Sequence, residues 1–170
     1  MKKHEKFIYR TIITLVVIAI PVAIIMIPAF LLGNTLGRPD QSRIERIFYR
    51  DKEDLVLIVN YFVETGRSSI HFRRADLHPS SQELRRITDD KVIEALTRLF
   101  NQRNYDVIVK DGNTIHFQVW SSLRIGVGIA YSINKYDEPI LDFLTHIEPL
   151  SVSGWYFYEE NYIEWRHQNR

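Results

Sequence analysis

The stretch GWYFYEENYIEW, residues 154–165, places six aromatic residues almost at the end of a 170-residue chain. If its first half is a strand, Trp155 and Phe157 face one side and Tyr156 and Tyr158 face the other, because successive side chains of a strand alternate. So much aromatic surface on both faces is too apolar to be left in solvent. We therefore predict that this stretch is the last strand of a domain, with Trp155 and Phe157 in its core.

Two other interpretations of this aromatic stretch remain open. Aromatic rings stack on carbohydrate-like ligands, and they also lie at membrane interfaces. Tyr158, Tyr162 and Trp165 are spaced i, i+4, i+7, which places them on one face if the chain ends in a helical turn. The candidate binding residues are therefore Trp155, Tyr156, Tyr158, Tyr162 and Trp165.

Further strands are indicated upstream of this stretch, where apolar residues alternate or run together over short segments. These segments are SSIHFR (68–73), YDVIVK (105–110), TIHFQVW (114–120) and IGVGIAYSI (125–133). We expect a three-residue turn, 111–113, that pairs Val109 with Ile115 and puts Asn113 in the left-handed conformation. This register is favoured because it buries one face of the hairpin.

Two helical patterns precede and separate these strands. Ser42 and Glu45 form a capping box at the start of the first pattern, and Gly66 ends it. The polar run RDKED (50–54) could divide this pattern into two helices, with Asp51 as a second N-cap. The second pattern, TDDKVIEALTRLFNQRN (88–104), ends at Asn104 in a left-handed conformation.

The order of these elements predicts the fold class. One or two helices, a strand, a helix and then three or four strands are typical of an α+β domain. We expect a two-layer domain over residues 42–170, with two or three helices packed on a mostly antiparallel sheet.

The N-terminal part contains the run IITLVVIAIPVAIIMIPAFLL, residues 12–32, which has no charged residue. As a helix this run is about 31 Å long, which matches the hydrocarbon thickness of a bilayer. A cleaved signal peptide would have a shorter apolar region and an A-x-A-like site, and neither is present. We therefore expect a single transmembrane helix over 12–33, after a short basic tail (1–11) and before a juxtamembrane linker (34–41).

The charges around this run indicate its orientation. Lys2, Lys3, Lys6 and Arg10 lie in the tail against one acidic residue, Glu5. The positive-inside rule then places the N-terminus in the cytoplasm and the C-terminal domain outside the plasma membrane of a bacterium. Arginine residues also follow the run, so the bias that supports this topology is small.

Composition excludes several classes of function. From Arg38 onward the chain has 18 basic and 20 acidic residues, a net charge of −2, so the domain lacks the basic field of a nucleic-acid-binding protein. Without cysteine, it can have neither disulfides nor thiolate metal sites. Gly126 and Gly128 lack the third glycine of a dinucleotide-binding loop and are more typical of a bulge or a close backbone approach.

Two sets of residues are candidates for a chemical site. His71, Asp76 and His78 are metal-ligand types in one loop region, but their spacing matches no zinc pattern, so we expect no metal and no cofactor. Glu159, Glu160 and Glu164 lie beside the aromatic rings, as carboxylates do in sugar-cleaving sites. Their positions in the sequence do not demonstrate the separation across a cleft that such chemistry needs.

These patterns favour binding over catalysis. We expect a membrane-anchored protein whose outer domain binds a ligand or another membrane or envelope protein, in an accessory, sensor or immunity-like role. The alternative is a membrane-anchored cell-envelope hydrolase that acts through Glu159, Glu160 or Glu164. A pocket with converging carboxylates would support the enzyme, and a closed core with a grooved face would support the binding protein.

Overall fold

The computed structural model describes residues 37–78, 81–122, 124–135, 137–161, 163 and 166. The chain divides into two units, Met1–Arg38 and Pro39–Arg170, and the fold below is that of the second. The expected tail and transmembrane helix, 1–11 and 12–33, lie outside the described residues. Among the helices that are described, none is both long enough and apolar enough to span a bilayer.

Six strands form one sheet in which all neighbours are antiparallel. Their order across the sheet is β1-β2-β3-β4-β6-β5, so β6 lies between β4 and β5. The connection from β4 to β5, residues 133–143, therefore has to pass the position of β6. The strands are β1 (Ser69–Arg73), β2 (Val107–Asp111), β3 (Thr114–Ser122), β4 (Ile125–Ser132), β5 (Leu144–Pro149) and β6 (Trp155–Asn161).

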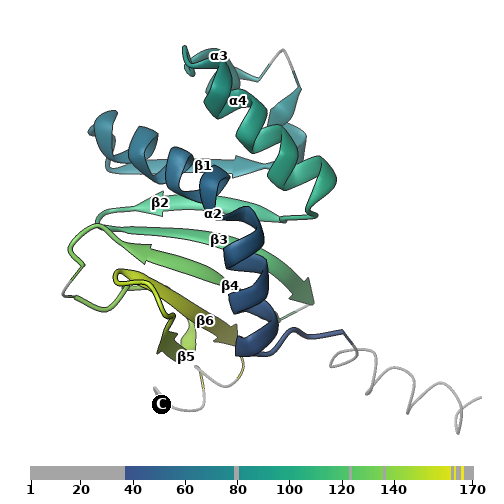
Figure 1. Ribbon diagram of the computed structural model, residues 1–170, viewed down its shortest axis with the longest axis vertical. Helices are drawn as coiled ribbons and strands as arrows, with labels where there is room; N and C mark the ends of the chain where they lie inside the picture. Colours follow the sequence, from purple (N-terminus) through teal and green to yellow (C-terminus); the bar gives the residue numbers. More distant parts are fainter. Residues whose placement is uncertain are drawn as a thin grey trace, which may run out of the picture. The chain divides into compact units, whose positions relative to one another are not determined.

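The helices cover one face of this sheet. Figure 1 shows α2 and α4 lying across the strands on the same side. The helical elements are α2 (Gln41–Glu64), the 3-10 turn η1 (Arg74–Leu77), α3 (Gln82–Arg85), α4 (Asp90–Thr97) and the π-helical turn η2 (Arg98–Gln102). Helices on an antiparallel sheet confirm the α+β class that the sequence predicts.

The hydrophobic core lies between the helices and the sheet. Phe62 of α2, Leu96 of α4 and Phe117 of β3 are fully buried there. Trp155 and Phe157 of β6 are only 4% and 5% exposed, so the prediction that they belong to the core is confirmed. The Trp155 ring contacts two other rings, with centroids 5.0 Å from Phe48 and 4.9 Å from Tyr131.

The first helical pattern is one helix, not two, because Asp51 is buried in the middle of α2 rather than capping a second helix. Its carboxylate accepts hydrogen bonds from Arg50 at 2.6 Å and from the Tyr105 hydroxyl at 3.1 Å. The Arg103 guanidinium lies 3.2 Å from the same carboxylate. A buried charge is tolerated when it is paired in this way. The partners at 103 and 105 are distant in sequence, so the local pattern did not indicate them.

The ends of the helices agree with the sequence in part. The N-cap of α2 is Asp40 rather than Ser42, since the Asp40 carboxylate accepts a hydrogen bond from the Arg43 amide at 2.8 Å. Gly66 follows the C-cap of α2 with a φ of 63°, and Asn104 has a φ of 59° after η2. Both residues end their helical segments in the left-handed conformation, as predicted.

The β2–β3 hairpin differs from its predicted register. Its turn has two residues, Gly112 and Asn113, and Val109 pairs with His116 instead of Ile115. Lys110 consequently points toward the helices, where its ammonium group donates to the carbonyl of Phe62 at 3.0 Å and to that of Arg67. Carbonyl groups at a helix C-terminus need such donors. The predicted register was wrong because it treated Lys110 as a surface residue.

Candidate functional site

The face of the sheet opposite the helices carries most of the unusual polar residues. We call it the outer face, because neither α2 nor α4 covers it (Figure 1). Strand alternation assigns side chains to it, since Phe117 and Phe157 face the core. Its residues on the central strands are Thr114, His116, Gln118, Gly126, Gly128, Ala130, Ser132, Tyr156, Tyr158 and Glu160.

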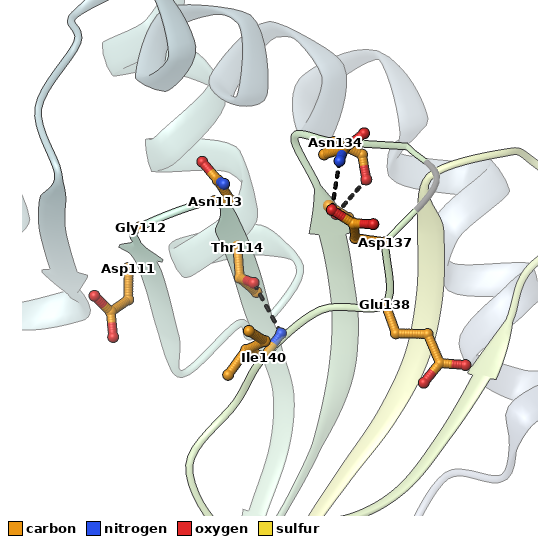
Figure 2. Close-up of a pocket in the computed structure, with 9 residues that line it drawn as sticks. Asp111, Gly112, Asn113, Thr114, Asn134, Asp137, Glu138 and Ile140 are labelled. Atoms are coloured by element: carbon orange, nitrogen blue, oxygen red, sulfur yellow. Dashed lines mark hydrogen bonds between the residues drawn. The ribbon is translucent and has the colours of Figure 1, made fainter.

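A loop crosses the outer face between β4 and β5, and we call residues 133–143 the crossing loop. The Ile140 amide donates to the Thr114 hydroxyl at 3.1 Å, and the Asn161 amide donates to the Phe143 carbonyl at 2.9 Å. Thr114 begins β3 and Asn161 ends β6, so these two anchors lie toward opposite ends of β4. The loop passes over the outer face between these anchors, with Asp142 and Phe143 in a turn and Phe143 at a φ of 58°; Figure 2 shows the loop beside Thr114.

Two glycine residues of β4 let side chains lie flat against the sheet beneath this loop. A Cβ atom on Gly128 would lie 2.2 Å from the Phe117 carbonyl oxygen and 2.8 Å from the Tyr158 ring. A Cβ atom on Gly126 would lie 2.3 Å from the Gln118 amide nitrogen. The strand register also shifts after Gln118, opposite these glycine residues. The predicted bulge or close approach at Gly126 and Gly128 is confirmed.

Beneath the crossing loop, two buried polar atoms lack hydrogen bonds. Tyr158 is fully buried, and neither its hydroxyl group nor the Nδ1 atom of His116 has a partner among the described residues. The two rings are neighbours, with centroids 5.8 Å apart and planes at 70°. A buried polar group without a partner costs about 1–3 kcal/mol. Such groups are few in native proteins, so a pair of them indicates an unused binding capacity.

Burial also changes the ionisation of this cluster. It lowers the pKa of His116 to about 4, with a further contribution from His71. Burial raises the pKa of Glu160 to about 7, and the charge of Asp142 on the crossing loop adds to this rise. Burial likewise raises the pKa of Tyr158. At neutral pH the cluster therefore contains an uncharged imidazole, an uncharged phenol and a carboxyl group that is about half ionised.

An open recess of about 300 Å³ lies where the crossing loop begins (Figure 2). Three of its residues are acidic, and the described part of its lining includes no Lys or Arg. It adjoins the buried cluster, because Thr114 is two residues before His116 on the same face of β3. The recess is lined by Asp111, Gly112, Asn113, Thr114, Ser132, Asn134, Asp137, Glu138 and Ile140.

The aromatic candidates do not form one binding surface. Trp155 is in the core, whereas Tyr156 and Tyr158 belong to the outer face. The Tyr156 hydroxyl donates to the Asp137 carbonyl at 3.5 Å, which links β6 to the crossing loop. Tyr162 and Trp165 lie outside the described residues. Of the described candidates, only the two tyrosine residues are near the recess and the buried cluster.

The carboxylate candidates are also separated. Glu159 faces the helix side of β6 and is buried, and Glu160 faces the outer side beneath the crossing loop. Glu164 lies outside the described residues. Asp142 is the acidic residue whose charge acts on Glu160, and it comes from the loop rather than from the aromatic stretch.

The metal-ligand candidates make other contacts. His71 Nε2 accepts a hydrogen bond from the Arg73 guanidinium at 3.0 Å, and Asp76 accepts one from the Arg73 amide at 2.7 Å. His78 also takes part in an interaction within the domain. Within the part of the chain that the structure describes, no three His, Asp or Glu side chains are placed to hold a metal ion.

Sequence reasoning named Tyr158 and Glu160 as candidates, but it missed His116 and did not bring the three residues together. Alternation along TIHFQVW does place His116 and Gln118 on one face, opposite Phe117. Nothing in the sequence indicates that a loop crosses that face and partly covers both side chains. Comparison of the chain with protein-family models, curated proteins and solved structures finds no match. Function therefore has to be inferred from the outer face itself.

Proposed function

We propose that the domain of residues 39–170 is a binding module, and that its recess takes an amine-bearing cationic group of a partner. The observation that carries this proposal is the charge of the recess. Asp111, Asp137 and Glu138 line the recess from different sides, and no basic residue is among its described lining (Figure 2). A field of one sign in a recess attracts ligands of the opposite charge.

The rest of the lining fits the side chain of a lysine or arginine. Such a side chain has an apolar stem and a cationic head. Ile140, which is 87% exposed at the recess, offers an apolar contact for the stem. The hydroxyl groups of Thr114 and Ser132 accept hydrogen bonds, as do the carboxylates. A basic peptide segment of a partner protein is therefore the ligand class that we propose.

The buried cluster supports the same location. His116 lies next to the recess along β3, and its Nδ1 atom and the Tyr158 hydroxyl group have unused hydrogen-bonding capacity. Catalysis is less well supported, because the described lining of the recess holds no nucleophile beside a base.

We further propose that the run 12–32 anchors this module in the plasma membrane, with the N-terminus in the cytoplasm and the domain outside. The support is the absence of charge over 21 residues and the basic tail before them. An anchored binding module fits an accessory, sensor or immunity-like role beside a membrane or envelope protein.

The test uses the domain from Pro39 onward, which contains the hydrophobic core as far as the structure describes it. Titration calorimetry with trilysine should show saturable binding, and triglutamate should show none. The variant Asp137→Asn/Glu138→Gln should bind trilysine about tenfold more weakly, since each exposed ion pair contributes up to about 1 kcal/mol. The control Glu53→Gln/Glu94→Gln loses the same charge on α2 and α4 and should bind like wild type. Equal trilysine binding by both variants would contradict the recess as the binding site.

A second candidate function is a cell-envelope hydrolase. It is favoured by Glu160, whose raised pKa beside Asp142 resembles the environment of a general acid. Glu159 is unsuitable as its partner, because it faces the other side of the sheet. Release of soluble fragments from purified envelopes, lost in Glu160→Gln, would favour the enzyme. No release by the wild-type domain would exclude this candidate.

A further inference from the structure

The first half of α2 carries a basic stripe on its solvent side. Arg43, Arg46 and Arg50 are spaced i, i+3 and i+7, which places them within an arc of about 60° on a helix. They are exposed, whereas Ile44 and Phe48 of the same turns are fully buried. Tyr49, which is 52% exposed, lies beside the stripe.

Most nearby acidic groups have other partners. The Asp40 carboxylate caps α2, and Glu45 accepts hydrogen bonds from Ser151. Arg50 is paired with Asp51, but Arg43 and Arg46 form no ion pair with any residue that the structure describes. Arg46 acts on the exposed Asp40 carboxylate through its charge alone, so both guanidinium groups keep their hydrogen-bond donors for an anion outside the domain.

Three observations together indicate what this anion is. Only eight residues, 33–40, separate the uncharged run from α2, and they reach at most about 28 Å. Tyrosine beside basic residues is the composition of surfaces that lie at lipid headgroups. The domain from Arg38 onward has a net charge of −2, so its overall charge does not attract it to an anionic surface. Binding to such a surface therefore requires a local basic patch.

We propose that the first half of α2 docks on anionic lipid headgroups through Arg43 and Arg46, with Tyr49 at the interface. The proposal rests on the membrane anchor, because the anchor holds the stripe at high local concentration beside the bilayer. α2 lies on one face of the sheet (Figure 1), and Thr114 and Ser132 of the recess belong to the opposite, outer face. Docking through α2 therefore leaves the recess turned away from the membrane and open to a partner.

Vesicle sedimentation with the domain from Pro39 onward tests the docking without the anchor. We expect binding to phosphatidylcholine vesicles that contain phosphatidylglycerol, and none to phosphatidylcholine alone. Each basic residue at such a surface contributes about fivefold, so Arg43→Gln/Arg46→Gln should weaken binding about 25-fold. Binding should also disappear in about 1 M NaCl, where the screening length is about 3 Å.

Two control variants separate charge from fold. Arg43→Lys/Arg46→Lys keeps both charges and should bind like wild type, with an unchanged melting temperature. Arg124→Gln/Lys135→Gln removes two exposed charges from the loops at the two ends of β4 and should also bind like wild type. An equal loss in this variant and in Arg43→Gln/Arg46→Gln would overturn the stripe as the docking surface.

The experiments distinguish a failure of the docking proposal from a failure of the membrane-anchor proposal. If the domain does not bind anionic vesicles while the full chain resists alkaline extraction from membranes, the docking proposal is wrong and the anchor proposal is retained. If the domain binds anionic vesicles but the full chain is extracted, the anchor is wrong, and α2 is a peripheral contact on its own.

Discussion

Trp155 and Ile140 are both large apolar residues, and the fold uses them in opposite ways. Trp155 is 4% exposed in the core, whereas Ile140 is 87% exposed on the crossing loop. Removing a buried large aromatic side chain costs about 3–5 kcal/mol, through lost burial and the cavity left behind. Trp155→Ala or Phe157→Ala should therefore lower the thermal midpoint of the domain strongly, and Ile140→Ala should leave it nearly unchanged. Near-normal midpoints for both aromatic variants would show that β6 is not part of the core.

Glu160 should make the stability of the domain depend on pH. Its pKa rises from 4.5 to about 7 on folding. Its contribution to the free energy of unfolding is therefore fully present below about pH 4.5 and is lost as the pH rises through about 7. Because glutamine cannot ionise, Glu160→Gln should gain about 2 kcal/mol relative to wild type between about pH 5 and about pH 8.

Urea unfolding of both proteins at the two pH values measures this difference. His116 acts in the opposite sense, because its lowered pKa gives stability that is lost as the pH falls through about 4. Wild type and Glu160→Gln share His116, so the comparison between them isolates Glu160. A constant difference in the free energy of unfolding at both pH values would contradict the buried, protonated carboxyl group.

The sequence was sufficient to assign the faces of β6 but not those of the β2–β3 hairpin. Trp155 and Phe157 are large and apolar, so alternation alone puts them in the core. Lys110 faces the core too, because the carbonyl groups of Phe62 in α2 and of Arg67 after it accept its hydrogen bonds. The inward position of Lys110 thus depends on a contact with Phe62, 48 positions away in the sequence. Local sequence patterns carry no information about such a contact.

At the scale of elements, the packing of β4 against its neighbours depends on Gly128 more than on Gly126. A Cβ atom on Gly128 would meet the Phe117 backbone, whereas one on Gly126 would meet the movable end of the Gln118 side chain. Overpacking that forces a backbone shift costs about 1–3 kcal/mol or more. Gly128→Ala should therefore lower the unfolding midpoint in urea well below that of Gly126→Ala. Equal midpoints would mean that the Phe117 backbone does not approach Gly128 as closely as the structure has it.

Elements with strong local signals were predictable, and connections were not. The caps at Gly66 and Asn104 follow from residue types that tolerate positive φ. The single helix α2 depends on Asp51 meeting Arg103 and Tyr105, and the crossing loop depends on where β5 joins the sheet. The outer-face site is built by that loop, so its residues could be named from the sequence but not brought together.

At the scale of the whole molecule, we predict that the chain remains with membranes. The reason is the uncharged run 12–32, which no polar residue other than Thr14 interrupts. Full-length protein should stay in the membrane pellet after an alkaline carbonate wash, and the domain from Pro39 onward should be released. Recovery of the full-length chain in the soluble fraction would contradict the anchor.

The outer face as a binding surface is the central claim, and an NMR titration of the isotope-labelled domain with trilysine tests it most directly. We predict saturable shifts for the backbone amides of Gly112 and Thr114, for Asn134 and Asp137 of the crossing loop, and for the His116 ring. Amides of α4 should not move, because that helix lies on the opposite face of the sheet. Shifts confined to the helices, or none that saturate, would contradict a binding site on the outer face.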